Sequence, residues 1–352
     1  MKKYIKIGIG ILVGILFIVA GLLLFLVITE YRPNETETIE TKGKAEKILS
    51  KEKEISILTY NIGYGALSEE EDFFMDGGKQ VQPDSKEVII KNIEGIKEQL
   101  KSHNTDVVFL QEVDVDSKRS YHVNEVKELW NSYGGTLGYA TNFRCAFIPY
   151  PWPPVGKVDG GIVTLNKFEV ESAERIAFPS SFSWPVSMCQ LKRCLLVERT
   201  PIEGTDKEMV FVNLHLEAYD SGEGKKIQSE ILTTLLKEEY TKGNYVVAGG
   251  DFNQYFSCAD IEKYPVINTE HFQALEFPEE YLGDQWQMVM DDTYPTSRLL
   301  NEPYDPDSSE TQYYMLDGFI VSPNVEITSL KTIDYDFKYT DHNPVRITVK
   351  LK

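Results

Sequence analysis

Polar side chains that could bind a metal or move protons follow one apolar run after another along this sequence. In chain order they are Asn61, Glu112, His215, Asp251, Asn253, Asp317, Asp341 and His342. Taken singly, a polar residue at the end of a strand is most often a turn former or a cap. Its recurrence at strand after strand, with two of the five histidines included, weakens that explanation.

These residue types suit one kind of chemistry. Carboxylate and amide oxygens are hard ligands of the kind that Mg²⁺ takes, usually with only one or two protein carboxylates. An imidazole near a carboxylate supplies acid–base function. Without a serine elbow, a cysteine–histidine motif or a P-loop, water is the expected attacking group. The pattern therefore predicts metal-assisted hydrolysis of a phosphate ester, with Mg²⁺ as the expected metal and Mn²⁺ as the alternative.

The apolar runs themselves predict strands, because they are short, rich in Val and Ile, and bounded by Gly, Asn, Asp or Pro. They cover 55–60, 106–111, 161–165, 194–198, 209–215, 245–250, 316–321 and 345–350. Apolar residues at helical spacing predict helices over 85–102 and 224–243. Strands dominate and helices are interspersed, so the expected fold class is mixed α/β.

The N-terminal segment predicts a membrane anchor. Residues 7–29 carry no charge, and about 20 apolar residues suffice to cross a bilayer as a helix. A cleaved signal peptide has a shorter apolar core, so an uncleaved anchor is the better interpretation. Lys2, Lys3 and Lys6 precede the span, whereas only Arg32 is basic just beyond it. The positive-inside bias thus predicts a single-pass protein of the cell membrane, with its N-terminus cytoplasmic and the rest extracellular.

Composition divides the rest of the chain. The segment after the span is rich in Glu, Lys and Thr with few apolar residues, which predicts a solvated stalk. No second linker or repeat follows. The expected organisation is a cytoplasmic N-terminus at 1–6, a transmembrane anchor at 7–29, a stalk or linker at 30–53 and one phosphoesterase domain at 54–352.

Charge and cysteine content bear on other classes of protein. The formal net charge is −19 and no Lys/Arg run follows residue 53, whereas non-specific nucleic-acid binding relies on basic patches. The four cysteines are too few for a disulfide scaffold, and the absence of a CxxC motif argues against a zinc ribbon. Cys189 and Cys194 are expected either to pair outside the cell or to be unpaired core residues.

The motifs, in this order, resemble those of the exonuclease–endonuclease–phosphatase family, the DNase-I-like hydrolases. The matching pieces are "TYNI" with Asn61, "LQEVD" with Glu112, "NLHL" with His215, "GGDFN" with Asp251 and Asn253, "LDGFIV" with Asp317, and "TDHNPV" with Asp341 and His342. They span residues 55–350. The resemblance implies a four-layer sandwich, in which two mixed β-sheets lie face to face with helices outside and the strand-end residues gather at one rim.

The resemblance also implies a role for each residue. Glu112 is expected to be the main Mg²⁺ ligand, with Asn61 and Asp341 close to the metal. His342 is the expected acid–base residue, and Asp317 is expected to orient it through a carboxylate–imidazole hydrogen bond. Asp251 is expected to position or activate the water. The remaining two residues, Asn253 and His215, are expected to hold the phosphate and its developing charge.

The loops between the motifs are the expected source of substrate choice. Residues 63–83 form a long acidic insertion with two Phe and a Met, and residues 144–161 and 178–188 are rich in aromatic residues and proline. They predict either ordinary surface loops or a rim that touches a lipid, since Trp and Tyr favour membrane interfaces. Three basic residues in or near these loops, Arg119, Arg144 and Lys157, are candidates to meet a phosphate.

The expected function is a cell-surface phosphodiesterase acting on a lipid or another amphiphilic phosphodiester. One alternative is a membrane-tethered extracellular nuclease, which a cluster of Lys and Arg on one flank of the rim would favour. The other is a catalytically inactive binding module, although no motif residue is missing. The expected partners are a phosphoester substrate, with a lipid headgroup preferred to nucleic acid, and the membrane through residues 7–29. No protein partner is inferred.

Overall fold

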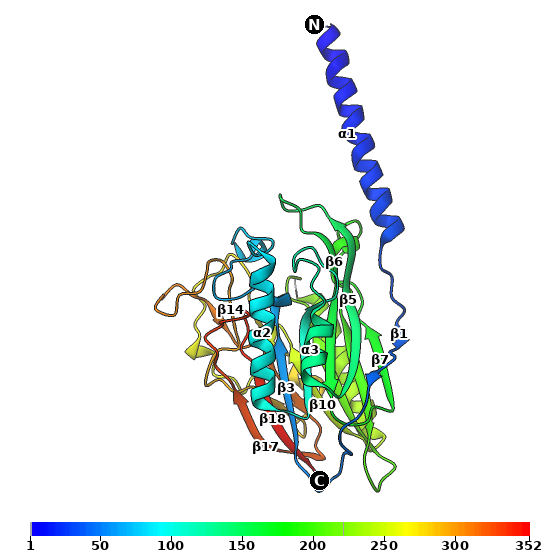
Figure 1. Ribbon diagram of the computed structural model, residues 1–352, viewed down its shortest axis with the longest axis vertical. Helices are drawn as coiled ribbons and strands as arrows, with labels where there is room; N and C mark the ends of the chain where they lie inside the picture. Colours follow the sequence, from blue (N-terminus) through cyan, green and yellow to red (C-terminus); the bar gives the residue numbers. More distant parts are fainter. Residues whose placement is uncertain (1, 221) are drawn as a thin grey trace.

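Two seven-stranded β-sheets lie face to face in the computed structural model, which describes residues 2–352 apart from residue 221 (Figure 1). The first sheet has the order β1 (Thr36–Thr38), β7 (Ser172–Ala177), β8 (Cys194–Pro201), β9 (Glu208–His215), β10 (Tyr245–Asp251), β16 (Asp317–Val321) and β13 (Gln287–Val289). The second has the order β17 (Val325–Thr332), β18 (Val345–Leu351), β3 (Ile55–Asn61), β4 (Val107–Asp114), β6 (Gly156–Asn166), β5 (Thr136–Ile148) and β2 (Lys42–Gly43). Both sheets are mixed, because β9–β10 and β3–β4 are parallel pairs among antiparallel ones.

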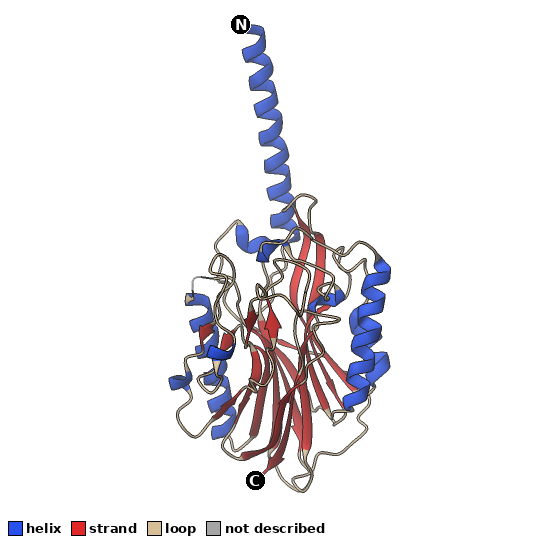
Figure 2. Cartoon of the chain, turned by 90° about the vertical axis from the view of Figure 1, so that its left-hand side faces the viewer, coloured by secondary structure: helices blue, strands red, loops and turns tan. Residues whose placement is uncertain are grey.

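Helices cover the outer face of each sheet (Figure 2). The second sheet carries α2 (Lys86–His103) and α3 (Glu125–Tyr133), whose buried Ile93 and Leu129 pack in one cluster with Leu58 and Val108. The first sheet carries α4 (Glu223–Thr241), packed through Leu232 and Leu236. The predicted four-layer sandwich is therefore confirmed, and both predicted helices form close to their expected boundaries.

Short elements complete the chain. The small strand pairs are β11 (Gln254–Tyr255) with β12 (Leu275–Glu276), and β14 (Ser297–Arg298) with β15 (Tyr313–Tyr314). The described part of the chain also has five 3₁₀ turns, which are η1 (Gly63–Gly65), η2 (Phe74–Asp76), η3 (Val186–Cys189), η4 (Ile261–Lys263) and η5 (Glu279–Tyr281). The sequence pattern missed β5, β7, β17 and α3, and it treated the long β5–β6 hairpin as a loop at 144–161.

The core between the sheets explains why the strands read as continuous apolar runs. Ile57, Phe109, Phe211, Val247 and Ile347 all belong to one buried cluster that joins the two sheets. Alternate residues of the same strands face the helices instead. A strand that is buried on both faces has no side exposed to water, so apolar and polar residues do not alternate along its sequence.

A carboxyl group lies inside this sandwich. Glu198 of β8 is fully buried, and its Oε2 accepts a hydrogen bond from Asn166 Nδ2 at 3.1 Å. Its Oε1 has no partner and lies against Gly138 of β5, where a Cβ would come within 2.2 Å of it. Burial raises the pKa of Glu198 to about 8. The glycine thus makes room for an acid that is kept neutral at moderate pH.

We expect Glu198→Gln to remove a pH dependence of stability. The folded pKa of Glu198 lies above its unfolded value, so its contribution is fully present below about pH 4.5 and is lost as pH rises through about 8. From about pH 5 to about pH 9, the wild type should lose on the order of a few kcal/mol of unfolding free energy relative to the variant, since one pKa unit is about 1.4 kcal/mol. Chemical denaturation of the full chain in detergent at several pH values measures this difference. The exposed Glu203→Gln is the control, and parallel pH curves for wild type and Glu198→Gln would contradict the prediction.

The expected solvated stalk at 30–53 is wrong. Within this segment β1 pairs with β7 at one edge of the first sheet, and β2 pairs with β5 at one edge of the second. Farther on, Leu49 forms a bridge with Ile202 and is only 1 % exposed. The reason is that a sheet edge offers unpaired N–H and C=O groups, and a Thr-rich extended segment can satisfy them despite its charges.

The N-terminal helix, α1 (Lys2–Thr29), projects from one end of the sandwich (Figure 1). It is long and apolar enough to cross a membrane, and it begins at Lys2, earlier than the predicted boundary at residue 7. Most of its apolar side chains are exposed, but Leu26 packs with Cys145 and Met188 of the domain. Just after the helix, Glu30 accepts a hydrogen bond from Lys192 Nζ at 3.1 Å. The helix is therefore docked at its C-terminal end.

The four cysteines are all free. Cys194 is buried in β8, whereas Cys189 lies beside Cys145, with the two sulfur atoms 3.7 Å apart. Of the two alternatives predicted for Cys189 and Cys194, the unpaired one describes this structure.

Candidate active site

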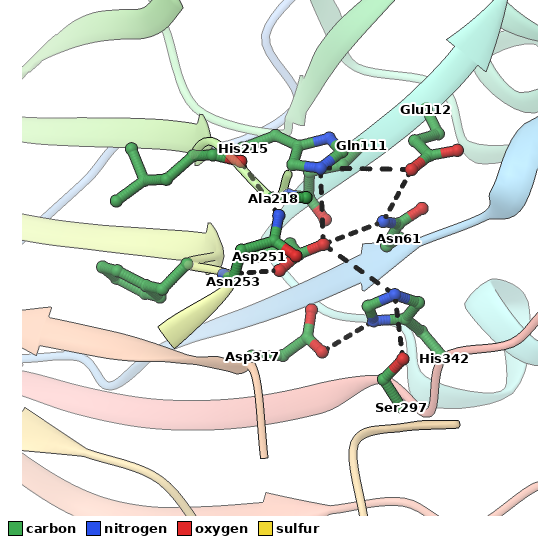
Figure 3. Close-up of polar contacts among 12 residues, drawn as sticks. Asn61, Gln111, Glu112, His215, Ala218, Asp251, Asn253, Ser297, Asp317 and His342 are labelled. Atoms are coloured by element: carbon green, nitrogen blue, oxygen red, sulfur yellow. Dashed lines mark hydrogen bonds and ion pairs between the residues drawn. The ribbon is translucent and has the colours of Figure 1, made fainter. Parts of the chain in front are cut away.

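Strand register explains why the predicted residues meet at one rim. Asp251, the last residue of β10, lies opposite His215 on β9 and opposite Asp317 on β16. In the second sheet, Asn61 at the end of β3 lies opposite Gln111 on β4, one residue before Glu112. The two ends face each other across the sandwich, so that residues from both sheets share one network of polar contacts (Figure 3).

A β-bulge aims Glu112 at this network. The register of β4 against β6 shifts between Leu110 and Val113, and Glu112 has a φ of 54°. A non-glycine residue in this region is strained, and a bulge re-aims the side chain that it carries. The result is a contact of 3.3 Å between Asn61 Nδ2 and Glu112 Oε1.

His342 is held between an acid and a hydroxyl. Its Nδ1 lies 2.8 Å from Asp317 Oδ2, and its Nε2 lies 3.3 Å from Ser297 Oγ and 3.8 Å from Asp251 Oδ2. Burial alone would lower the pKa of His342, but the carboxylates of Asp317, Asp341 and Asp251 raise it well above the usual value. The imidazole is thus a fixed cation at neutral pH, with Nε2–H directed at the cavity.

The second imidazole has the opposite character. Burial, Arg193 and His342 together hold the pKa of His215 well below its usual value, so this ring is neutral. Its Nε2 lies 3.4 Å from Asp251 Oδ2 and 4.0 Å from Glu112 Oε1. Two histidines in one site with pKa values pushed apart can play different roles, one as a charged proton donor and one as a neutral hydrogen-bond donor.

Asp251 is the shared acceptor of the cluster. Asn61 Nδ2 donates to its Oδ2 at 3.1 Å, and the backbone N–H of Asn253 donates to its Oδ1 at 2.9 Å. Burial and the neighbouring Asp317 raise the pKa of Asp251 to about 6. A carboxylate that titrates near neutrality can accept a proton from water. Asn253 itself donates its side-chain amide to Leu216 O at 2.9 Å, and so fixes the turn that carries Asp251.

The donor set fits a hard divalent cation. Glu112 and Asp341 both line the active-site cavity. Burial raises the pKa of Glu112, and burial raises that of Asp341 to about 7, with Glu112 adding to this shift. Two mutually repelling carboxylates are what a cation of the Mg²⁺ type would neutralise. Asn61 donates through Nδ2 to Glu112 and Asp251, while its Oδ1 accepts from Gly63 N at 3.1 Å, so it orients these two carboxylates in this arrangement.

A second acidic grouping is formed by Asp251, Asp317 and His342, whose candidate ligand atoms lie within 4.8 Å of one another. The contact of 2.8 Å between Asp317 and His342 already pairs opposite charges there. Glu112 and Asp341 are therefore the better candidates to hold the cation, and the second grouping is better suited to proton transfer.

Sequence reasoning missed several residues of the site. Ser297, which contacts His342, lies on a two-residue strand in an irregular region. Gln111 and Asn213 form a buried hydrogen bond of 2.8 Å beneath the catalytic residues. Polar residues inside apolar runs were visible in the sequence and could have indicated this support.

The three basic candidates have different places. Arg119 lines the cavity, where Asp114 holds it through two hydrogen bonds of 2.9 and 3.0 Å and its guanidinium stacks on Tyr64. Arg144 lies at the base of α1, paired with Asp159. Lys157 forms an ion pair with Asp116. Of the three, Arg119 alone reaches the cavity.

The cavity above these residues has a volume of about 640 Å³, within the usual range of small-molecule sites. All three predicted substrate loops contribute to its lining, for example through Phe74, Tyr150 and Met188. The last turns of α1 contribute Leu22 and Leu26. The cavity thus runs from the catalytic cluster to a largely apolar wall.

This fold and site define a hydrolase built on a two-sheet sandwich, with its acid–base cluster at the strand ends. A family model described as "Endonuclease/Exonuclease/phosphatase family" matches residues 58–334. The chain belongs to this family, and membership in the family supports its assignment as a phosphoester hydrolase. No curated protein matches the sequence.

Solved structures agree on the fold. An endonuclease/exonuclease/phosphatase from Beutenbergia cavernae is 16% identical with a TM-score of 0.57, over 85% of this chain and 72% of that one. A relative from Bacteroides vulgatus is 15% identical with a TM-score of 0.51, over 85% and 100%. TDP2 of D. rerio, in complex with a single-stranded DNA product, is 16% identical with a TM-score of 0.52, over 85% and 99%.

Proposed function

We propose that this protein is a Mg²⁺-dependent phosphodiesterase that acts on lipid phosphodiesters at the cell surface, anchored by α1. The observation that carries the proposal is the shape of the cavity. Its polar end holds Glu112, Asp251 and His342, and its apolar wall includes Leu22 and Leu26 of the helix that is fit to cross a membrane. A phosphate placed at the polar end leaves the rest of an amphiphilic substrate against an apolar surface.

The residues divide the chemistry among them. A divalent cation held by Glu112 and Asp341 would neutralise phosphoryl oxygens and lower the pKa of water. Asp251 accepts a proton from the attacking water, as its raised pKa allows. His342, oriented by Asp317, offers Nε2–H to the leaving oxygen. His215 donates Nε2–H to a phosphoryl oxygen as negative charge develops. Asn253 supports these steps by fixing Asp251 and is the candidate for a further contact to the phosphate.

The surface around the cavity mouth supports a membrane-facing orientation. The β5–β6 hairpin extends toward the end of the molecule from which α1 projects (Figure 1). At its tip, Trp152 is 90 % exposed and Tyr150 is also exposed, and Trp184 is exposed in the third substrate loop. Exposed Trp and Tyr beside a membrane span are typical of the lipid–water interface.

A substrate panel tests the proposal with the full chain in lipid nanodiscs and Mg²⁺. The substrates are bis-p-nitrophenyl phosphate, p-nitrophenyl phosphate, sphingomyelin or phosphatidyl-lipid, and plasmid DNA. We expect Mg²⁺-dependent turnover of the phosphodiesters, with lipid preferred to plasmid by at least about tenfold, since DNA binding relies on basic contacts. Plasmid nicking without lipid turnover would make the protein a tethered nuclease. Its substrate would then be nucleic acid, as in the structure of D. rerio TDP2 with a single-stranded DNA product. Turnover of p-nitrophenyl phosphate alone would make it a phosphomonoesterase.

A further inference from the structure

The last turns of α1 form part of the active site as well as an anchor. Leu22, Leu23 and Leu26 line the catalytic cavity. Leu26 is 5 % exposed because it packs with Cys145 and Met188, whereas Leu24, on the opposite side of the helix, is 60 % exposed. One face of α1 thus belongs to the cavity and the other is free to contact lipid.

The position of this wall is fixed by the residues that follow the helix. Glu30 contacts Lys192 at 3.1 Å and Arg32 at 2.9 Å. The Tyr31 ring lies under Arg144, with the guanidinium 5.2 Å from its centroid. Beyond this junction, β1 is hydrogen-bonded to the edge of the first sheet. The helix therefore meets the cavity at a defined place, with no flexible segment between them.

The cavity lining beyond α1 is apolar as well. Ile148 at the end of β5, Val186 and Met188 of η3, and Phe74 of η2 contribute to it. Aliphatic and thioether side chains match a hydrocarbon chain and offer it no hydrogen bonds, and methionine adapts to irregular shapes. The leucines of the wall are continuous with the exposed apolar surface of α1, so the helix and the cavity lining form one apolar surface.

We propose that α1 and the loops packed against it form an acyl-chain subsite, in which Leu22 and Leu26, together with Ile148 and Met188 of the same apolar cluster, hold the chain of a membrane lipid. This proposal rests on the proposed lipid phosphodiesterase function and names the part of the protein that selects for it. The phosphate then lies at Glu112 and His342, while the chain remains in contact with the membrane-spanning helix. Substrate selection depends on chain length as well as on the headgroup.

Leu22→Trp tests the subsite, because the larger side chain narrows the cavity at α1 and leaves the catalytic residues unchanged. The matched control is Leu24→Trp on the exposed face of the helix. The full chain in nanodiscs is assayed on a long-chain phospholipid and on bis-p-nitrophenyl phosphate, which has no chain. We expect Leu22→Trp to lower kcat/KM at least tenfold more on the lipid than on bis-p-nitrophenyl phosphate, and Leu24→Trp to change neither substrate. Equal lipid turnover by the two variants would overturn the proposal, as would an equal loss by Leu22→Trp on both substrates.

Photolabelling separates this proposal from the proposed activity. A phospholipid with a photoactivatable diazirine in its acyl chain is added to nanodiscs, and labelled peptides are identified by mass spectrometry. We expect label within residues 143–150 and 185–191 of the wild type and of Leu24→Trp, reduced at least fivefold in Leu22→Trp. If the wild type hydrolyses bis-p-nitrophenyl phosphate but no lipid, the proposed activity fails, and label at these loops would still support an acyl-chain site. Label confined to α1 would overturn the site, whatever the activity.

Discussion

His342→Ala is expected to lose most of the hydrolytic activity while the protein folds normally. Asp317 Oδ2 lies 2.8 Å from His342 Nδ1 and so orients the imidazole, whose Nε2 then faces the cavity. Removing a positioned general acid typically costs about 10²- to 10⁴-fold in rate, and we expect a kcat on bis-p-nitrophenyl phosphate reduced at least 100-fold. Turnover with Mg²⁺ and thermal unfolding of the same preparation measure the two halves of the prediction.

The control for this variant is His122→Ala. His122 is exposed, pairs with Asp116 at 2.6 Å and lies outside the cavity lining, so its loss should leave kcat unchanged. Asp317→Asn adds a test of orientation, because the amide keeps the shape but removes the charge that favours the imidazolium. We expect Asp317→Asn to lower kcat less than His342→Ala does. A His342→Ala protein that turns over substrate at nearly the wild-type rate would refute the assigned role.

Glu112→Gln is expected to weaken binding of the divalent cation. Glu112 is aimed into the cavity by the β4 bulge, and it raises the pKa of Asp341, which lines the same cavity and is also buried. The amide removes one negative charge and keeps the side-chain size. Since even outer-shell changes cost about 10- to 100-fold in metal affinity, the Mg²⁺ concentration for half-maximal turnover should rise by at least about tenfold.

Calorimetric titration of Mn²⁺ into the same variant provides a readout that does not depend on turnover. The half-buried Glu128→Gln on α3, outside the cavity lining, has the same change of charge and should bind the cation like the wild type. An unchanged Mn²⁺ affinity in Glu112→Gln would show that Glu112 is not a ligand. The cation site would then be assigned to the grouping of Asp251, Asp317 and His342. Asp317→Asn would then be the variant that weakens binding.

Short-range signals predicted a mixed α/β fold and the candidate site residues, and the family resemblance implied the four-layer sandwich. Strands such as 209–215 and 245–250 are apolar runs that end in His215 and Asp251, and the parallel register of β9 with β10 places these ends side by side. The motif order then gave the family, which the match over residues 58–334 confirms. The individual roles of these residues stay predictions until the variants are measured.

What the sequence could not indicate depends on contacts between distant segments. Residues 30–53 looked like a stalk because their composition is charged, yet their backbone pairs with sheet edges that are assembled far along the chain. The contact of Ser297 with His342 likewise needs two segments to meet, and neither has a periodic pattern. The positive φ of Glu112 follows from a mismatch between β4 and β6 that neither strand reveals alone.

The pairing of residues 36–43 with the edges of both sheets sets the height of the catalytic centre over the bilayer, when α1 lies in the membrane as proposed. A domain on a flexible tether would move through the solution near the membrane, and its rate would depend on the substrate concentration in bulk solution. If α1 lies in the membrane, this docked domain samples only the molecules that diffuse to its base in the plane of the membrane. The quantity that governs its rate is then the number of substrate molecules per unit area, and diluting the lipid with an inert one should slow it even at constant total substrate.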